Sequence, residues 1–360
     1  MRLATAAQGR DNNFNLIRIV AALLVLVTHS FALSTGNPAA EPLRAPLGIT
    51  LGVIAVDLFF VASGFLVYGS LVRSHSLIEF AWARTLRIEP ALLAMLLLTV
   101  FGLGTLYTSE PLTAYLSSPQ TRGYLLECAT LFGGVAYELP GVFERNPFPN
   151  GVNGSLWTLP YEVRMYAALA LLWVAGRGFG LRRTRLLEIA VVTLALAAGA
   201  LMVALHFQNA GEQPLPRLAF MFFTGASYHV LRERIRLSAR VFGVLLASVI
   251  AAAFIHRDAF FAVYSLGVAY ILFWLAYVPA GWLRGYNRVG DYSYGTYIYA
   301  FPVQQAIVAR VPGITAAPLL LASAVVTLAL AVLSWHLLER PALARKQRCV
   351  DWTRKLLRRS

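Results

Sequence analysis

Charged residues are scarce in this sequence. Only 13% of its 360 residues are charged, whereas 58% are hydrophobic, and the mean hydropathy is +0.63. Soluble domains carry about 25% charged residues and about 45–50% apolar ones. A water-soluble protein of this size would lack the polar residues needed to cover its surface. The composition therefore predicts an integral membrane protein.

Motifs that define several common enzyme classes are also absent. We find no metal-ligand spacing, no glycine-rich phosphate-binding loop and no nucleophile elbow, so no metal and no permanently bound cofactor are expected. Cys128 and Cys349 fall on opposite membrane sides in the topology below, so we expect no internal disulfide. The first apolar run carries Arg18 and His29 and lacks a small-residue cleavage site, so we expect a retained helix rather than a signal peptide.

Long apolar runs, in contrast, are plentiful. A spanning helix needs about 20 mostly apolar residues. Ten runs approach this length: 14–34, 48–72, 89–107, 156–176, 186–206, 215–231, 239–255, 258–279, 291–310 and 315–338. The sequence thus predicts an all-α, polytopic transmembrane bundle of about ten spanning helices. No long linker interrupts it, so we expect one integral-membrane domain over residues 1–342 and a basic cytoplasmic tail over 343–360.

The net charge of +14 comes mostly from arginines in short loops. If both termini are cytoplasmic, 23 of the 31 Lys and Arg residues lie inside, two lie within helices and six lie outside. The six outer residues are Arg44, Arg122, Arg145, Arg217, Arg257 and Arg310. Cytoplasmic loops carry such an excess, so we expect an N-in, C-in topology and no nucleic-acid partner. The basic tail could lie on anionic lipid or remain solvated, and the sequence leaves both open.

The first predicted helix carries two ionisable side chains on one face. Arg18 and His29 are eleven residues apart, which is three helical turns with a remainder of about 20°. Their axial separation is about 16.5 Å, a distance that resembles the reach of an extended phosphopantetheine arm. Ionisable residues within a span are costly and usually face a cavity or a partner. We therefore expect a cytoplasmic anion near Arg18 and a base, His29, in the outer half of the membrane.

Two carboxylates are predicted at a similar depth. Asp57 lies about 13 Å and Glu162 about 10 Å below the outer end of their helices, and His29 lies about 7 Å down. A carboxylate beside an imidazole fixes its tautomer and strengthens it as a base. The alternative is that these groups only hold helices together. Arg164, two residues after Glu162, points to another face of the same helix and is not an obvious partner.

A pair of arginines precedes the third apolar run. Arg84 and Arg87 are three residues apart, so they share a helix face at the expected cytoplasmic interface. Two guanidinium groups in this arrangement can hold phosphates bidentately. Ordinary anchoring of a cytoplasmic loop by positive charge is the competing interpretation.

These residues belong to a series of short motifs in a fixed order. Arg18 and His29 are followed by Val56-Asp-Leu-Phe-Phe-Val-Ala-Ser-Gly-Phe-Leu66, Arg84-Thr-Leu-Arg87-Ile-Glu-Pro90, Asn153-Gly-Ser-Leu-Trp-Thr-Leu-Pro-Tyr-Glu162, Asp291-Tyr-Ser-Tyr-Gly-Thr-Tyr-Ile-Tyr299 and Glu339-Arg-Pro341. The series, over about residues 12–342, resembles the membrane-bound acyltransferase 3 family, the polysaccharide and lipopolysaccharide O-acetylases of bacterial envelopes. One departure is Ala300-Phe-Pro302, where the family more usually has an aromatic residue or His before Phe-Pro.

The resemblance implies transfer of an acyl group, commonly acetyl, from cytoplasmic acyl-CoA to a hydroxyl of an envelope glycan or glycolipid, by a multi-pass protein of a bacterial inner membrane. His29 matches the family's catalytic histidine and Arg18 its companion arginine. Asp57 matches the acidic residue near the acyl site. Arg84 and Arg87 match the pair associated with CoA.

Our mechanistic hypothesis gives each group a role. The CoA phosphates bind the three arginines, and His29 either removes the proton of the sugar hydroxyl or forms an acyl-histidine intermediate. Asp57 or Glu162 orients the imidazole, and Trp157 stacks on the sugar ring. The alternative is a secondary transporter whose buried charges form a proton relay. Transporters usually show paired halves, which the sequence lacks.

Overall fold

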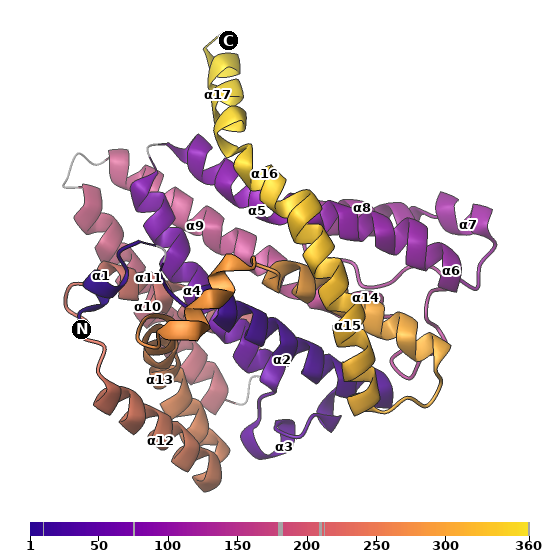
Figure 1. The fold of residues 1–360 in the computed structure, drawn as a ribbon, viewed down its shortest axis with the longest axis horizontal. Coiled ribbons are helices and arrows are strands. Elements are labelled where there is room, and N and C mark those ends of the chain that lie inside the picture. The colour runs from indigo at the N-terminus through magenta and orange to yellow at the C-terminus, as the bar shows by residue number, and fades with distance from the viewer. Residues whose placement is uncertain (10, 75, 179–182, 209–210, 212, 359–360) are drawn as a thin grey trace.

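A computed structural model describes residues 1–9, 11–74, 76–178, 183–208, 211 and 213–358. The described residues form a helical bundle without a β-strand (Figure 1). Its ten long helices are α2 (Phe14–Thr35), α4 (Leu51–Arg73), α5 (Leu77–Leu97), α9 (Leu159–Gly178), α10 (Arg183–Phe207), α11 (Pro214–Val230), α12 (Ala239–Ile255), α13 (Arg257–Tyr277), α14 (Ser293–Arg310) and α15 (Ala316–Ser334). Each of the ten predicted apolar runs lies on one of these helices, which confirms the all-α fold.

In the described part of the chain, six helical segments are long and apolar enough to cross a membrane. They are Phe14–Thr35, Leu51–Arg73, Leu77–Tyr107, Arg185–Phe207, Arg257–Tyr277 and Ala316–Ala344. The helices α9, α11, α12 and α14 are not among them. The membrane character of the chain is thus supported, whereas the count of about ten spans and the N-in, C-in orientation stay predictions.

Shorter helices connect the long ones. They are α1 (Leu3–Ala6), η1 (Pro38–Ala40), α3 (Arg44–Leu47), η2 (Leu98–Gly104), α6 (Thr105–Tyr107), α7 (Leu112–Ser117), α8 (Pro119–Thr130), η3 (Gly154–Thr158), η4 (Gly281–Arg288), η5 (Trp335–Glu339), α16 (Arg340–Ala344) and α17 (Lys346–Leu357). Two of them, η2 and η5, are π-helical turns that continue α5 and α15 without a break. Turns of this kind occur mostly as bulges within α-helices, frequently at functional sites.

The third apolar helix begins earlier than predicted. The prediction placed its start near residue 89, but α5 begins at Leu77 and runs through η2 and α6 to Tyr107. The Ser76 hydroxyl accepts a hydrogen bond from the backbone N–H of Glu79, and this Ser-x-x-Glu pattern starts a helix. Arg84 and Arg87 consequently lie within a candidate span rather than in the connection before it.

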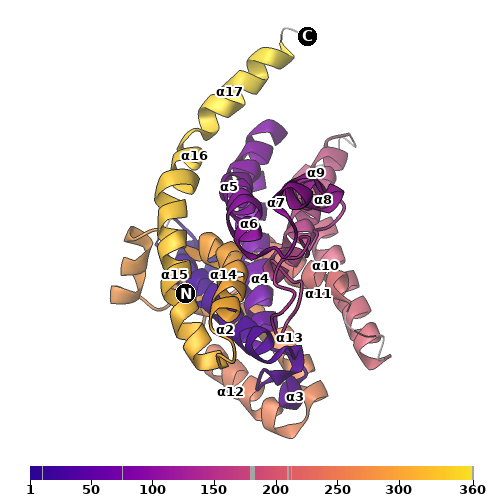
Figure 2. The ribbon, with the colours of Figure 1, turned by 90° about the vertical axis from the view of Figure 1, so that its right-hand side faces the viewer.

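The bundle is built around α4, which packs between α2 and α11, while α2 also packs against α14 (Figures 1 and 2). Helices α4 and α11 cross at two glycines. A Cβ atom at Gly64 would lie 1.8 Å from the carbonyl oxygen of Phe222, and one at Gly225 would lie 2.0 Å from that of Val61. Small residues at a crossing let two backbones touch, which stabilises helix pairs where water supplies no driving force.

The C-terminal tail contains helix α17, which contacts the bundle through α5. Helix α17 continues the line of α15 and α16 and projects beyond the other helices (Figures 1 and 2). Trp82 of α5 donates a hydrogen bond to Thr353, and Lys346 forms an ion pair with Glu79. The predicted tail reaches residue 360, but residues 359–360 lie outside the described part of the chain.

The glycine crossing makes a stability prediction. Replacing Gly225 with Leu should force α4 and α11 apart and lower the melting temperature of the detergent-purified protein, because an overpacked core costs about 1–3 kcal/mol or more. Gly243→Leu is the matched control, since a Cβ at Gly243 of α12 meets no atom within 4 Å. Equal melting temperatures for the two variants would contradict the crossing.

Candidate active site

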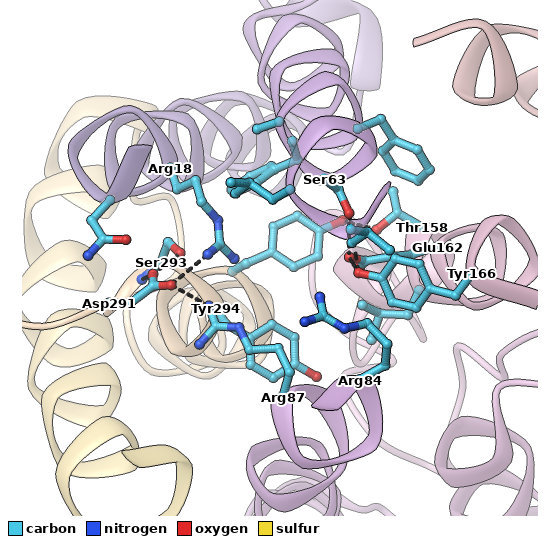
Figure 3. Close-up of a pocket in the computed structure, with 18 of the residues that line it drawn as sticks. Arg18, Ser63, Arg84, Arg87, Thr158, Glu162, Tyr166, Asp291, Ser293 and Tyr294 are labelled. Atoms are coloured by element: carbon cyan, nitrogen blue, oxygen red, sulfur yellow. Dashed lines mark hydrogen bonds and ion pairs between the residues drawn. The ribbon is translucent and has the colours of Figure 1, made fainter. Parts of the chain in front are cut away.

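A cavity of about 410 Å³, which we call the first cavity, lies where α2, α4, α5, α9 and the beginning of α14 meet (Figure 3). Ligand pockets have volumes of about 300–1,000 Å³. Its charged lining residues are Arg18, Arg84, Arg87, Glu162 and Asp291. Four of these five were selected from the sequence as site residues, and the structure brings them to one place.

Asp291 joins two of the arginines. Its Oδ2 atom lies 2.5 Å from a guanidinium nitrogen of Arg18 and 2.5 Å from one of Arg87, while its Oδ1 atom accepts a hydrogen bond from the Ser293 hydroxyl. Two guanidinium groups at this distance favour the ionised form of Asp291. The carboxylate therefore stays charged and holds both guanidinium groups in fixed positions.

A second carboxylate supports Arg87 from the π-helical turn η5. Glu339 is fully buried and lies 3.5 Å from Arg87, and it accepts a hydrogen bond from Ser334. The guanidinium carbon of Arg87 also lies 5.9 Å from the ring centres of Tyr294 and Trp335. Both charges of Arg18 and Arg87 are thus balanced by carboxylates of the bundle, in the way that buried ion pairs require.

Glu162 and Arg84 line the first cavity on the side away from Asp291 (Figure 3). The Tyr166 hydroxyl donates a hydrogen bond to Glu162, and the Ser63 hydroxyl lies 3.4 Å from the same carboxylate oxygen. Arg84 lies over the Tyr166 ring at 5.7 Å, and its guanidinium group lies between the Asp291 group and the Glu162 group (Figure 3). Among the described residues, Arg84 has no ion pair with a carboxylate, and its buried Nε atom has no hydrogen-bond partner.

The arrangement can bind an anion. Three guanidinium groups face a cavity that contains two carboxylates, and one of the two is shared between Arg18 and Arg87. Arg84 is the cation that the described bundle leaves without a counter-ion. Arginines present several N–H donors that match phosphate oxygens, so a phosphate is the group that best satisfies Arg84.

His29 does not line the first cavity. Its ring contacts Phe301 edge to face at a centroid distance of 5.0 Å, and no described group hydrogen-bonds to its buried Nδ1 atom. Tyr297, which does line the cavity, precedes Phe301 by one turn of α14, or about 6 Å. The hydroxyls of Tyr297 and Thr158 hydrogen-bond at 2.7 Å in the cavity wall. The imidazole thus belongs to the layer one turn beyond that wall.

Asp57 and Trp157 line a second cavity, also of about 410 Å³. Asp57 is almost fully buried, accepts a hydrogen bond from Tyr264 and lies 3.4 Å from Arg217. Glu162 lines the first cavity, so the two predicted carboxylates face different spaces. The structure records no contact of either one with His29 among the described residues.

The two cavities lie back to back, toward opposite ends of the bundle. Val56 lines the first and Asp57, the next residue of α4, lines the second. In the same way Thr158 lines the first and Trp157 of η3 lines the second. Adjacent residues of α4, and adjacent residues of η3, therefore face two different spaces.

Several side chains at these cavities had no role predicted from the sequence. Asp291 and Glu339 each belong to one of the short motifs of the sequence. Their place in a motif was the sequence feature that could have indicated a functional role. Tyr166 and Arg217 stood in no motif and follow from the structure alone.

Comparisons with known proteins agree with the motifs. The sequence model of the acyltransferase 3 family, described as an acyltransferase domain, matches residues 11–336. The chain belongs to the acyltransferase 3 family. An O-acetyl transferase of Shigella phage Sf6 is 32% identical to it over 357 residues, which cover 93% of this chain and 97% of the relative. Nodulation protein 10 of Rhizobium leguminosarum bv. viciae is 30% identical over 370 residues, which cover 94% of each chain. No solved structure gives a significant match.

Membership of the acyltransferase 3 family confirms the resemblance that the motifs predicted. This acyltransferase is an enzyme of acyl-group transfer, and its relatives support O-acyl transfer. Membership of this family argues against the alternative of a secondary transporter.

The shared carboxylate makes a second prediction. Asp291→Asn should leave two buried guanidinium groups beside each other without their counter-ion, at a cost of about 3–5 kcal/mol in the free energy of unfolding. Thermal melting of the purified acyltransferase measures the loss. Adding Arg18→Met should restore part of it, because one unpaired charge is removed.

Asp351→Asn on the exposed face of α17 is the control, since Asp351 accepts a hydrogen bond from Gln347 alone among the contacts of the described chain. A melting temperature of Asp291→Asn equal to that of the control would show that Asp291 does not balance the two arginines.

Proposed function

We propose that this acyltransferase moves an acetyl group from acetyl-CoA, taken from the cytoplasm, to a hydroxyl of an envelope glycan or glycolipid on the other side of a bacterial inner membrane. The observation that carries the proposal is the first cavity, where Arg84 faces the interior of the bundle without a carboxylate partner. The acetyl group is proposed because a relative over nearly the whole chain is an O-acetyl transferase.

In this proposal the CoA phosphates bind at Arg84, with Arg87 and Arg18 beside it. The first cavity lies near the beginnings of α2 and α5, which the distribution of arginines assigns to the cytoplasmic side. Arg18 and Arg87 are already balanced by Asp291, so Arg84 supplies most of the uncompensated positive charge. Arg84 is therefore the main contact of the CoA phosphates, and Arg18 and Arg87 lie beside the bound phosphates.

The acyl arm then extends toward His29. The distance between Arg18 and His29 along α2 is about 16.5 Å, and the hydrogen bond between Thr158 and Tyr297 lies on the way. We propose that the arm passes this wall when the donor binds. The thioester carbonyl then lies in the layer of His29 and Phe301, whose rings are in contact.

His29 acts there as the general base. Its imidazole takes the proton of the sugar hydroxyl as the oxygen attacks the thioester carbonyl. A C–O bond forms, the C–S bond breaks, and the proton passes to the departing CoA thiolate, so that an acetyl ester and free CoA result. Transfer through an acetyl-histidine remains the alternative order of the same steps. Because of the cavities that they line, we place Glu162 on the donor side and Asp57 with Trp157 on the acceptor side.

His29→Ala should abolish acetyl transfer while the protein folds normally. General base catalysis contributes about 10²–10⁴-fold, so transfer of radiolabelled acetyl groups to envelope glycan should fall by at least about 100-fold. His256→Asn is the matched control, because His256 is exposed and caps α13. Acetylation retained in a folded His29→Ala variant would discard His29 as the base.

Arg84→Gln should raise the apparent KM for acetyl-CoA by about 10- to 100-fold with little change in kcat. A charge-assisted hydrogen bond contributes about 1.5–3 kcal/mol, and a contact equal in ground and transition states affects KM alone. Steady-state kinetics with a soluble glycan acceptor measures the effect. Arg84 is a cleaner target than Arg87, which also binds Asp291 and Glu339.

Arg164→Gln serves as the control for this measurement, since Arg164 is exposed, lies over the Tyr161 ring and does not line the first cavity. A fall in kcat with an unchanged KM for acetyl-CoA would argue that Arg84 acts in the reaction and not in donor binding.

A further inference from the structure

The second cavity lies toward the end of the bundle opposite to the first. Its walls come from the beginnings of α4, α11 and α13, the end of α10, helix α3 and η3. With a volume of about 410 Å³, it is large enough for one or two sugar rings. Asp57 of α4 and Trp157 of η3 line it, and their chain neighbours Val56 and Thr158 line the first cavity.

Aromatic side chains form much of this cavity. Trp157, Phe260, Phe261 and Tyr264 line it, and Phe260 and Tyr264 stack with their ring centres 5.4 Å apart. Phe260 and Tyr264 are buried, whereas Trp157 is partly exposed, and a partly exposed aromatic ring beside polar groups is suited to the apolar face of a sugar ring. Hydrogen-bonding groups stand between them, including the Tyr264 hydroxyl and His206, which pairs with Asp258 at 2.9 Å.

Arginines are concentrated in this cavity beyond what topology explains. Basic residues are depleted on the outer side of a membrane protein, and only six are assigned to that side here. Three of the six, Arg44, Arg217 and Arg257, line this one cavity. The described carboxylates that line it are Asp57 and Asp258.

The best-placed cation is Arg217. Its Nε atom lies 3.4 Å from Asp57 without the geometry of a hydrogen bond, so the buried Nε and the buried Oδ1 atom of Asp57 both lack a hydrogen-bond partner within the described chain. Asp57 therefore holds the side chain of Arg217 in place. The N–H donors of Arg217 remain for a ligand, since Asp57 is the one carboxylate paired with it among the described residues.

We propose that the second cavity binds an acceptor that carries an oxyanion, a phosphate or a carboxylate, attached to a sugar. This rests on the proposed function, in which the acceptor is a glycan or glycolipid. Arg217 and Arg257 bind the oxyanion, and Trp157 packs on the sugar ring. Asp57 is a positioning residue, because it acts on the ligand through Arg217.

The test is equilibrium binding to the intact protein in lipid nanodiscs, without donor. The probes are glucose 1-phosphate, glucuronate, methyl glucoside and inorganic phosphate. Glucose 1-phosphate or glucuronate should bind at least about tenfold more tightly than methyl glucoside, since a charge-assisted pair contributes about 1.5–3 kcal/mol. Whichever of the two binds identifies the oxyanion. Equal affinity for the charged and neutral sugars would overturn the proposal.

Variants distinguish the contribution of the arginines to binding from that of the Trp157 ring. Arg257→Gln and Arg217→Gln should each weaken binding of the charged sugar by about tenfold or more, and Arg310→Gln, on the same side but outside this cavity, should not. If Arg217→Gln does not fold because Asp57 loses its partner, Arg217→Lys and Arg257→Gln still decide the point. Unchanged affinity in Arg257→Gln and Arg217→Lys would overturn the proposal.

Trp157→Ala should weaken binding of the charged sugar and leave that of inorganic phosphate unchanged. Inorganic phosphate binding as tightly as glucose 1-phosphate would overturn sugar recognition. His29→Ala should bind the charged sugar as the unmodified protein does. Failure of His29→Ala to lose transfer would thus count against the proposed reaction, whereas failure of charge selectivity would count against this acceptor site alone.

Discussion

Asp291 is the point on which the first cavity depends. It precedes α14 and binds Arg18 of α2 and Arg87 of α5 through one carboxylate oxygen. Two guanidinium groups buried together would repel each other and lose their hydration, at a cost of several kcal/mol for each ion. The shared carboxylate removes that repulsion, and Ser293 and Glu339 hold the carboxylate and Arg87 in turn. Three helices distant in sequence are thereby fixed around one space.

Arg84 differs from its two neighbours because the described bundle gives it no counter-ion. An unpaired cation in a cavity of a membrane helix bundle is expensive. A ligand that supplies the missing negative charge recovers this energy when it binds. The network around Asp291 thus does two things: it neutralises two arginines, and it leaves the third available in a fixed orientation.

Helix α14 is not one of the six candidate spans, although most of its residues are buried. Its polar side chains are buried against neighbouring elements, which lowers its hydropathy without exposing it to solvent. Gln304 donates to Ser30 and to the carbonyl of Leu26 on α2, and Gln305 donates to the carbonyls of Phe148 and Gly151 in the segment before η3. Hydrogen bonds from these buried amide groups to neighbouring elements favour one arrangement of the helices. The same helix carries Tyr297 and Phe301, so it positions both the wall of the first cavity and the contact of His29.

The sequence by itself determined the helices, since apolar length and caps such as Ser76 are local properties. It also determined the family, because the order of short motifs survives in the chain. It selected Arg18, Arg84 and Arg87 as one anion site, and the structure gathers them around one cavity. The depth of His29, Asp57 and Glu162 below the outer ends of their helices could likewise be counted from the sequence. Only the tertiary structure decided the direction in which each side chain points. Asp57 and Glu162 lie at similar depths but face different cavities. Asp291 contacts Arg18, which is 273 positions away in the chain. The direction of a side chain depends on how each helix is rotated against its neighbours. That rotation is set by contacts such as the crossing of Gly64 and Gly225, which no local pattern specifies.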